Sequence, residues 1–213
     1  MLPEMRLLYF DITRGNWIGF QAMRAEFGFL EALSIAVAMQ LRLVFRHPFS
    51  EYNKTNQVDA RGRLSQRQMA PMIALYTVMQ EKGYAKERAI EALRRISAAV
   101  AVEFLKFNVP IVRKQDWAGR SRDEKMGFLN KITSRFFNAE AESSLSEDDS
   151  FQFNVSKCYF AYYAQVLGVK ELGPLFCESD RMFFDHYQKD IRFERNQTLA
   201  IQGQPCDFQF FWK

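Results

Sequence analysis

The sequence predicts an α+β protein that is mostly helical and carries a small C-terminal antiparallel sheet. Apolar residues recur every three or four positions over most of the first 140 residues, which is the spacing of helices with one buried face. From Phe151 onward, apolar residues instead alternate with polar ones, as in strands with one buried face. The 213 residues are 48% apolar and 25% charged, which suffices for a folded domain with a sizeable core.

Helical spacing predicts four long helices in the first part of the chain. The first is expected to end before His47-Pro48, because proline disfavours helical geometry in the preceding residue. It forms either one helix or two helices broken near Gly28. The expected ranges are 16–46, 65–82, 85–107 and 121–141.

Capping patterns predict where two of these helices begin. Ser65 with Gln68, and Ser121 with Glu124, have the spacing at which a serine and a Glu or Gln bond the first backbone N–H groups of a helix. Gly83 suits the C-terminal cap of the second helix.

Two polar segments are expected to form loops. Residues 48–62 would join the first two helices. Residues 140–150 are acidic and serine-rich, and would form a solvated hinge. The hinge separates a helical N-terminal part, residues 1–142, from an α+β C-terminal part, residues 150–213, and we expect the two parts to pack as one compact domain.

The C-terminal part is expected to contain three strands and two helices. The helices would follow the first strand, and the turn Gly203-Gln204-Pro205 would join the last two strands in an antiparallel hairpin. The expected strands are 151–156, 191–196 and 206–212, and the expected helices are 157–167 and 171–187, the latter starting at Glu171 or Pro174.

Charge and hydropathy favour a cytoplasmic protein with a small-molecule partner. The net charge is +4, but basic residues alternate with acidic ones, as in Lys86-Glu87-Arg88, so we expect no nucleic-acid partner. The most apolar run, residues 32–45, is shorter than the roughly 20 residues of a membrane span, so no membrane partner is expected. Its apolar surface could instead support a homodimer. The N-terminus lacks a signal-peptide pattern, and three cysteines without short spacing indicate reduced thiols.

An ordered string of residues runs through the last sixty positions. It consists of Cys158, Leu167-Gly168, Glu171-Leu172, Phe176-Cys177-Glu178-Ser179-Asp180, Phe193-Glu194-Arg195, Thr198-Leu199-Ala200 and Cys206-Asp207-Phe208-Gln209-Phe210. This string resembles the hallmark of the L-2-amino-thiazoline-4-carboxylic acid hydrolase family. The resemblance implies a hydrolase that opens a cyclic amidine C–N bond, converting 2-amino-thiazoline-4-carboxylate to a carbamoyl-cysteine.

Residues of this string suit such chemistry. Cys177 and Asp180 are three positions apart on an expected helix and therefore share a face, so they could act as nucleophile and general acid/base. Glu178 would face elsewhere. Arg195 could clamp the substrate carboxylate, or pair with Asp180 or Asp207 in a buried ion pair.

Three further residues are candidates for substrate binding. Cys158 is expected in the first turn of its helix, where backbone N–H groups lower the pKa of a thiol. Thr198 could orient a ligand or make a cross-strand contact. Cys206 and Asp207 point to opposite faces of their strand, so at most one of them reaches a given pocket.

The alternative is a non-catalytic small-molecule-binding or thiol-sensing module with an aromatic pocket. The 21 phenylalanines favour this, and the C-terminal pattern is also similar to vinyl-reductase-type ligand-binding domains. No spacing places His47 or His186 beside a cysteine. Neither a metal site nor a cofactor is expected, because metal-ligand spacings and glycine-rich phosphate loops are missing from the sequence.

Overall fold

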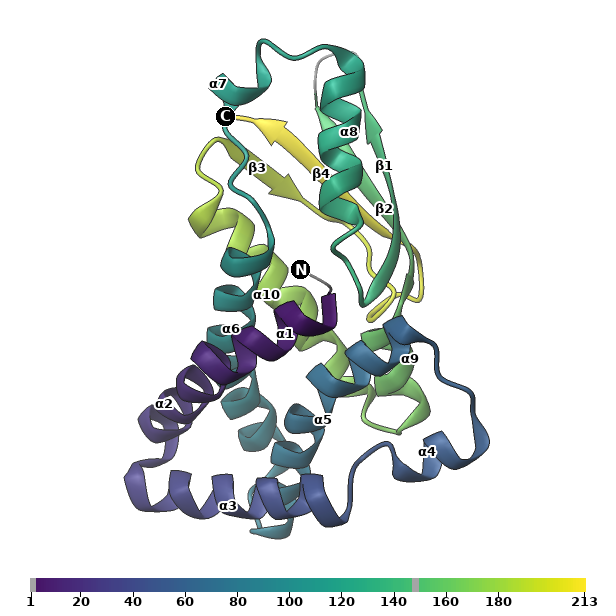
Figure 1. Cartoon of the computed structure of the whole chain (residues 1–213). Helices are drawn as coiled ribbons and strands as arrows, with labels where there is room; N and C mark the ends of the chain where they lie inside the picture. The colour runs from purple at the N-terminus through teal and green to yellow at the C-terminus, as the bar shows by residue number, and fades with distance from the viewer. Residues whose placement is uncertain (1–2, 147–149) are drawn as a thin grey trace.

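The computed structural model describes residues 3–146 and 150–213, and places a layer of helices at one end of the molecule and a sheet at the other (Figure 1). The α+β fold class is confirmed: helices dominate and the sheet is antiparallel. The helical elements are α1 (Pro3–Phe10), the π-helix η1 (Asp11–Gly15), α2 (Asn16–Phe27), α3 (Phe29–Phe45), α4 (Ser50–Thr55), α5 (Ala60–Glu81), α6 (Lys86–Asn108), α7 (Lys114–Trp117), α8 (Arg122–Thr133), α9 (Tyr159–Val166), η2 (Lys170–Leu172) and α10 (Gly173–Tyr187).

Several predicted helix boundaries are confirmed. Gly28 separates α2 from α3 with φ 77°, a backbone conformation that glycine adopts without strain. Gly83 follows α5 with φ 84°. Ser121 and Glu124 form the predicted capping box at the start of α8.

The start of α5 was predicted wrongly. The helix begins at Ala60 and not at Ser65, because Asp59 is the N-cap and its Oδ1 accepts a 2.6 Å hydrogen bond from the backbone N–H of Gly62. Within the segment expected to be a loop, residues 48–62, the short helix α4 also forms. Ser65 lies inside α5, where its hydroxyl donates to the backbone carbonyl of Arg61.

The sheet has four strands, in the order β1-β2-β4-β3, and every pair is antiparallel. The predicted hairpin of the last two strands is confirmed. The strands are β1 (Ala139–Leu145), β2 (Phe151–Cys158), β3 (Ile191–Glu194) and β4 (Cys206–Trp212).

Strand β1 replaces part of the expected hinge. The helix predicted for 121–141 ends at Thr133, and the chain then pairs with β2 along residues 139–145. Residues 147–149 of the expected hinge lie outside the described residues. Alternating burial along β1 shows why it forms: Ala139 and Leu145 are buried, while the glutamates between them point outward.

One face of the sheet carries the aromatic core. Phe151, Phe153, Phe208 and Phe210 are all buried, and register pairs Phe151 with Phe210 and Phe153 with Phe208. Residues of α8 and α10 cover this face, including Leu129, Ile132, Phe183 and Phe184. A second apolar core joins α2, α3, α5, α6 and α9.

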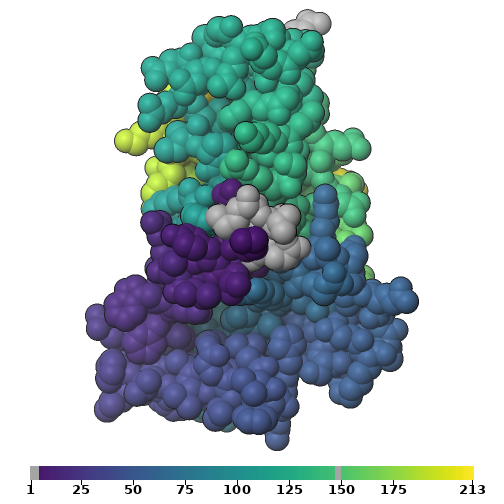
Figure 2. All heavy atoms as spheres, viewed as in Figure 1, coloured from purple at the N-terminus to yellow at the C-terminus, as the bar shows by residue number. Residues whose placement is uncertain are grey.

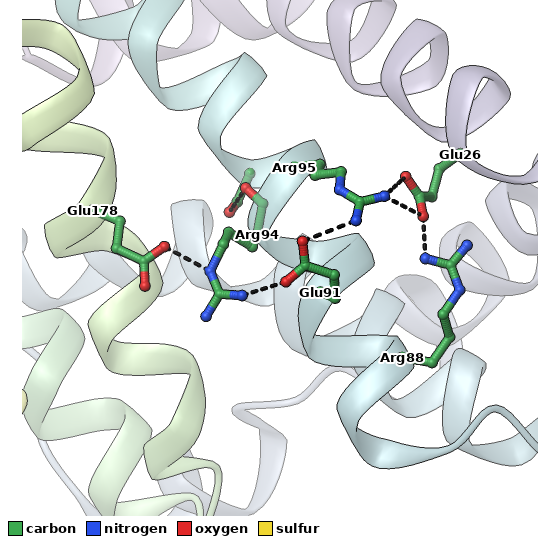
Figure 3. Close-up of polar contacts among 7 residues, drawn as sticks. Glu26, Arg88, Glu91, Arg94, Arg95 and Glu178 are labelled. Atoms are coloured by element: carbon green, nitrogen blue, oxygen red, sulfur yellow. Dashed lines mark hydrogen bonds and ion pairs between the residues drawn. The ribbon is translucent and has the colours of Figure 1, made fainter.

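Ion pairs connect α6 to helices on both of its sides (Figure 3). On one side, Glu26 of α2 accepts hydrogen bonds from Arg88 and Arg95 of α6. On the other, Arg94 of α6 donates a 2.7 Å bond from Nε to Glu178 of α10. Helix α6 therefore holds the N-terminal helices and α10 in one arrangement.

The N-terminal helices α1 and α2 spread across the face shown in Figure 2, between the sheet-bearing end and α3. The outward side of α3 exposes large apolar residues, namely Phe29, Leu30, Leu33, Val37, Leu41, Val44 and Phe45. In the described part of the chain, no helix is both long and apolar enough to span a membrane.

Candidate functional site

A cavity of about 650 Å³ lies between the helical layer and the end of the sheet. Apolar side chains form most of its wall, and seven of them are phenylalanines: Phe10, Phe20, Phe104, Phe136, Phe160, Phe176 and Phe208. Among the described residues that line it, only Asp11, Arg67 and Asp180 are charged. A large apolar cavity with a few convergent polar groups is typical of a small-molecule site.

Four of the six predicted site residues meet at this cavity. Cys177 and Asp180 lie on the same face of α10, as their spacing predicts. Cys158 at the end of β2 and Cys206 at the start of β4 line the same cavity. The fold thus brings three thiols and one carboxyl group together from three separate elements.

Of the two acidic residues among the described lining residues, Asp180 is the one that acts on all three thiols. The fold surrounds the carboxyl group, but 29% of its side-chain surface stays free, as expected for a group that faces a cavity. Burial raises the pKa of Asp180 to about 6, although the neighbouring Arg195 acts to lower it. A carboxyl group with a pKa near neutrality can both accept and donate a proton at physiological pH.

Arg195 is held by protein groups on several sides. Its Nη1 lies 3.3 Å from Asp180 Oδ2, and its Nη2 donates a 2.8 Å hydrogen bond to the backbone carbonyl of Cys177. The guanidinium also lies over the rings of Phe193 and Phe208. Only 6% of the side chain is exposed. Of the two arrangements foreseen for Arg195, the structure shows the buried ion pair with Asp180.

All three thiols are held in the protonated form at neutral pH. Burial raises the pKa of Cys177 to about 12, with the Asp180 carboxylate adding to the shift, and raises that of Cys158 to about 11. Burial also raises the pKa of Cys206. The expected lowering at Cys158 was wrong. Cys158 ends β2 and is the N-cap of α9, and burial raises its pKa by more than the nearby backbone N–H groups of Ala161 and Phe160 lower it.

Thr198 lies in a turn and is not among the lining residues. Its hydroxyl accepts a bond from the backbone N–H of Ile201, and its own N–H donates to Gln202 Oε1 at 2.8 Å. The next two residues of the string, Leu199 and Ala200, do line the cavity. Thr198 therefore shapes the loop that brings these two apolar residues to the wall.

The acidic neighbours point away, as predicted. Glu178 pairs with Arg94. Asp207 accepts bonds from the backbone N–H groups of Asn196 and Gln197, which fixes the turn after β3 and leaves Cys206 facing the cavity.

The cavity wall holds a second polar pair that no sequence pattern predicts. Asp11 of η1 and Arg67 of α5 form a 3.2 Å ion pair, and both line the cavity. Burial raises the pKa of Asp11 more than Arg67 lowers it. This pair depends on η1 folding over α5, which residue spacing does not reveal. π-Helical turns such as η1 occur frequently at functional sites.

Neither histidine is among the residues lining the cavity. His47 contacts the Phe49 ring and its Nδ1 accepts from the backbone N–H of Phe49, whereas His186 is exposed on the last turn of α10. Within residues 3–146 and 150–213, no three His, Cys, Asp or Glu side chains are grouped so that they could hold a metal ion.

Fold and site together define an α+β protein with a buried carboxyl group and thiols around an apolar cavity. The chain belongs to the L-2-amino-thiazoline-4-carboxylic acid hydrolase family, which matches residues 62–210. The match extends beyond the C-terminal third to include most of α5, all of α6 and all of the sheet except the last two residues of β4. Neither the curated proteins nor the solved structures include a significant match to the chain.

Proposed function

We propose that this protein is a hydrolase that opens a cyclic amidine C–N bond, with Asp180 as the general acid/base. The observation that carries the proposal is a carboxyl group with a pKa of about 6 inside an apolar cavity of a chain from this family. The family substrate, 2-amino-thiazoline-4-carboxylate, is the first compound to test.

The reaction adds one water molecule and needs no other reactant. The Asp180 carboxylate takes a proton from water as the water oxygen bonds to the ring carbon between nitrogen and sulfur. Asp180 then returns this proton to the ring nitrogen. As the C–N bond breaks, the second proton of the water passes from the new C–OH group to the same nitrogen, so the carbonyl and the free amine form together. The product is an S-carbamoyl-cysteine with a free amine.

Water is the proposed nucleophile because Cys177 remains a thiol. With a pKa of about 12, Cys177 supplies almost no thiolate at neutral pH, and thiolate is the nucleophilic form. Cys177, Cys158 and Cys206 then form the soft, weakly polar wall against which the substrate sulfur packs.

Two arginines serve different purposes in this proposal. Arg195 is a positioning residue, since its donors hold Asp180 and the adjacent turn of α10. Arg67 lines the cavity with 40% of its side chain exposed, so it is the better candidate to bind the substrate carboxylate.

Turnover of 2-amino-thiazoline-4-carboxylate tests the proposal. General acid/base catalysis contributes roughly 100- to 10,000-fold, so Asp180→Asn should lose at least about 100-fold in rate. Asp185→Asn, an exposed site on the same helix, is the matched control and should retain the wild-type rate. Equal rates in both variants would remove Asp180 from the mechanism.

The product identifies the bond that breaks. C–N cleavage leaves the sulfur blocked and frees the amine, whereas C–S cleavage frees a thiol that a thiol reagent detects. Release of one thiol per turnover would contradict the proposed C–N cleavage while leaving hydrolysis in place.

A non-catalytic binding module is the second candidate, and the apolar cavity favours it. A thiol-sensing role is disfavoured, because the raised pKa values of the three cysteines leave little of the reactive thiolate form. Saturable binding of the family substrate without any turnover would select this alternative.

A further inference from the structure

The cavity is much larger than the family substrate. That substrate has about nine non-hydrogen atoms and would occupy on the order of 150 Å³, if each pair of atoms fills about the volume of one water molecule. The cavity measures about 650 Å³, within the range of sites that hold drug-sized ligands. Most of its volume is therefore left over once a thiazoline ring lies beside Asp180.

The rest of the cavity wall is apolar, and helices α2, α3 and α6 supply much of it. Phe20, Met23, Met39 and Leu43 come from α2 and α3, and Leu93 faces them from α6. Helices α2 and α3 precede residue 62, so they lie outside the part of the chain that matches the family. In this apolar chamber, the part of the wall that α2 and α3 supply therefore lies outside the matched residues, whereas the part that α6 supplies lies inside them.

We propose that the natural ligand carries an apolar substituent, with its amidine head at Asp180 and its tail in the chamber between α2, α3 and α6. The placement of the amidine head group at Asp180 rests on the proposed function. The tail site follows from the volume and from the chemistry of the wall. Burying a chain of this kind is favourable because it removes apolar surface from water on both partners.

The surface outside the chamber is apolar too. Ala36 and Gln40 of α3 line the chamber and also line a shallow groove formed with Val37, Leu41 and Val44 on the outer side of the same helix. The groove and the chamber therefore adjoin along α3.

S-alkyl isothioureas test the proposal, because they combine a cationic amidine head with a tail of chosen length. Burial of one methylene is worth about 0.8 kcal/mol, or up to about fourfold in affinity. From S-methyl- to S-octylisothiourea, we expect calorimetry to show affinity rising at least about tenfold. A flat series would overturn the proposal.

Two matched glycine variants distinguish binding of the tail inside the chamber from binding of the tail on the protein surface. Gly19 of α2 lines the cavity, and a Cβ there would meet only Val100 Cγ2, at 3.6 Å, which is an ordinary contact. Gly19→Leu therefore adds its side chain to the wall of the cavity. Gly127→Leu makes the same change on α8, at an exposed position where a Cβ meets nothing within 4 Å. Gly19→Leu should reduce the octyl-to-methyl affinity ratio at least about tenfold, and Gly127→Leu should leave it unchanged.

An unchanged ratio in Gly19→Leu would place the tail on the protein surface and overturn the proposal. Both readouts are binding measurements, so they do not depend on turnover. If Asp180→Asn keeps full activity but the chain-length series behaves as expected, the catalytic proposal fails and the tail site stands.

Discussion

Arg195 holds Asp180 and the backbone of Cys177 with a single guanidinium group. One nitrogen lies 3.3 Å from Asp180 Oδ2, and the other donates at 2.8 Å to the Cys177 carbonyl oxygen. Arg195 acts to lower the pKa of Asp180, against burial, which raises it to about 6. The ion pair therefore keeps Asp180 able to ionise near neutral pH in a site that would otherwise keep it protonated.

Arg195→Gln should raise the pKa of Asp180 further, because it removes the cation that acts to lower this pKa. The variant should lose most of its turnover at pH 7 and recover part of it at higher pH. Arg195→Lys keeps the charge and should restore more activity than Arg195→Gln does. Equal pH profiles for wild type and Arg195→Gln would show that the pair does not set the titration.

Asp180 should also make stability depend on pH. Its pKa is about 6 in the folded protein against an ordinary value of 3.8, so the folded state favours the protonated form. That contribution is fully present below pH 3.8 and is lost as pH rises through 6. Relative to wild type, Asp180→Asn should therefore gain about 2 kcal/mol of unfolding free energy between pH 4 and pH 7.5.

Urea denaturation at several pH values measures this difference directly. Only the change with pH is diagnostic, because the variant also leaves Arg195 without its carboxylate partner at every pH. A wild-type-to-variant difference that is constant from pH 4 to pH 7.5 would contradict a raised pKa.

The three cysteines should resist modification in the native protein. Burial raises the pKa of each thiol, and thiolate is the reactive form. A thiol reagent at pH 7.5 should therefore react slowly with the native protein and rapidly with all three cysteines in denaturant. Rapid, selective labelling of Cys177 in the native state would contradict this prediction and would support Cys177 thiolate as the nucleophile.

Glu26 should contribute measurably to stability, because 8% of its side chain is exposed and two α6 arginines bind it (Figure 3). Burial acts to raise its pKa, but hydrogen bonds from Arg88 and Arg95 outweigh burial and lower it. Glu26→Gln should cost about 1–2 kcal/mol at pH 7, and the loss should fade as pH falls below the ordinary pKa of 4.5. Glu51→Gln, at an exposed ion pair, is the control and should cost almost nothing.

The sequence predicted the elements that depend on residues close to one another in the chain. Helix α6 spans 86–108 against the predicted 85–107, because its apolar stripe is regular along the whole helix. Gly28 and the Ser121 capping box were recognised because each acts within one turn of helix. The shared face of Cys177 and Asp180 follows from helical spacing alone.

The features that were missed depend on contacts between distant segments. Strand β1 consists largely of small and acidic residues with low strand propensity, and it forms because β2 offers an edge to pair with. Asp59 caps α5 and also accepts a bond from the Tyr159 hydroxyl, a hundred residues away. The cavity itself requires η1 and α2 to fold across α5 and α6, so its size and its Asp11–Arg67 pair had no local sequence signal.

The pH dependence of kcat/KM for 2-amino-thiazoline-4-carboxylate tests the central claim, that Asp180 carries the proton, most directly. For a general base whose pKa in the free enzyme is about 6, kcat/KM should rise with pH through about 6 and level off near neutrality. In Asp180→Asn the residual rate should lack this step. A wild-type profile that is flat from pH 5 to pH 7.5, or an unchanged step in Asp180→Asn, would contradict the account.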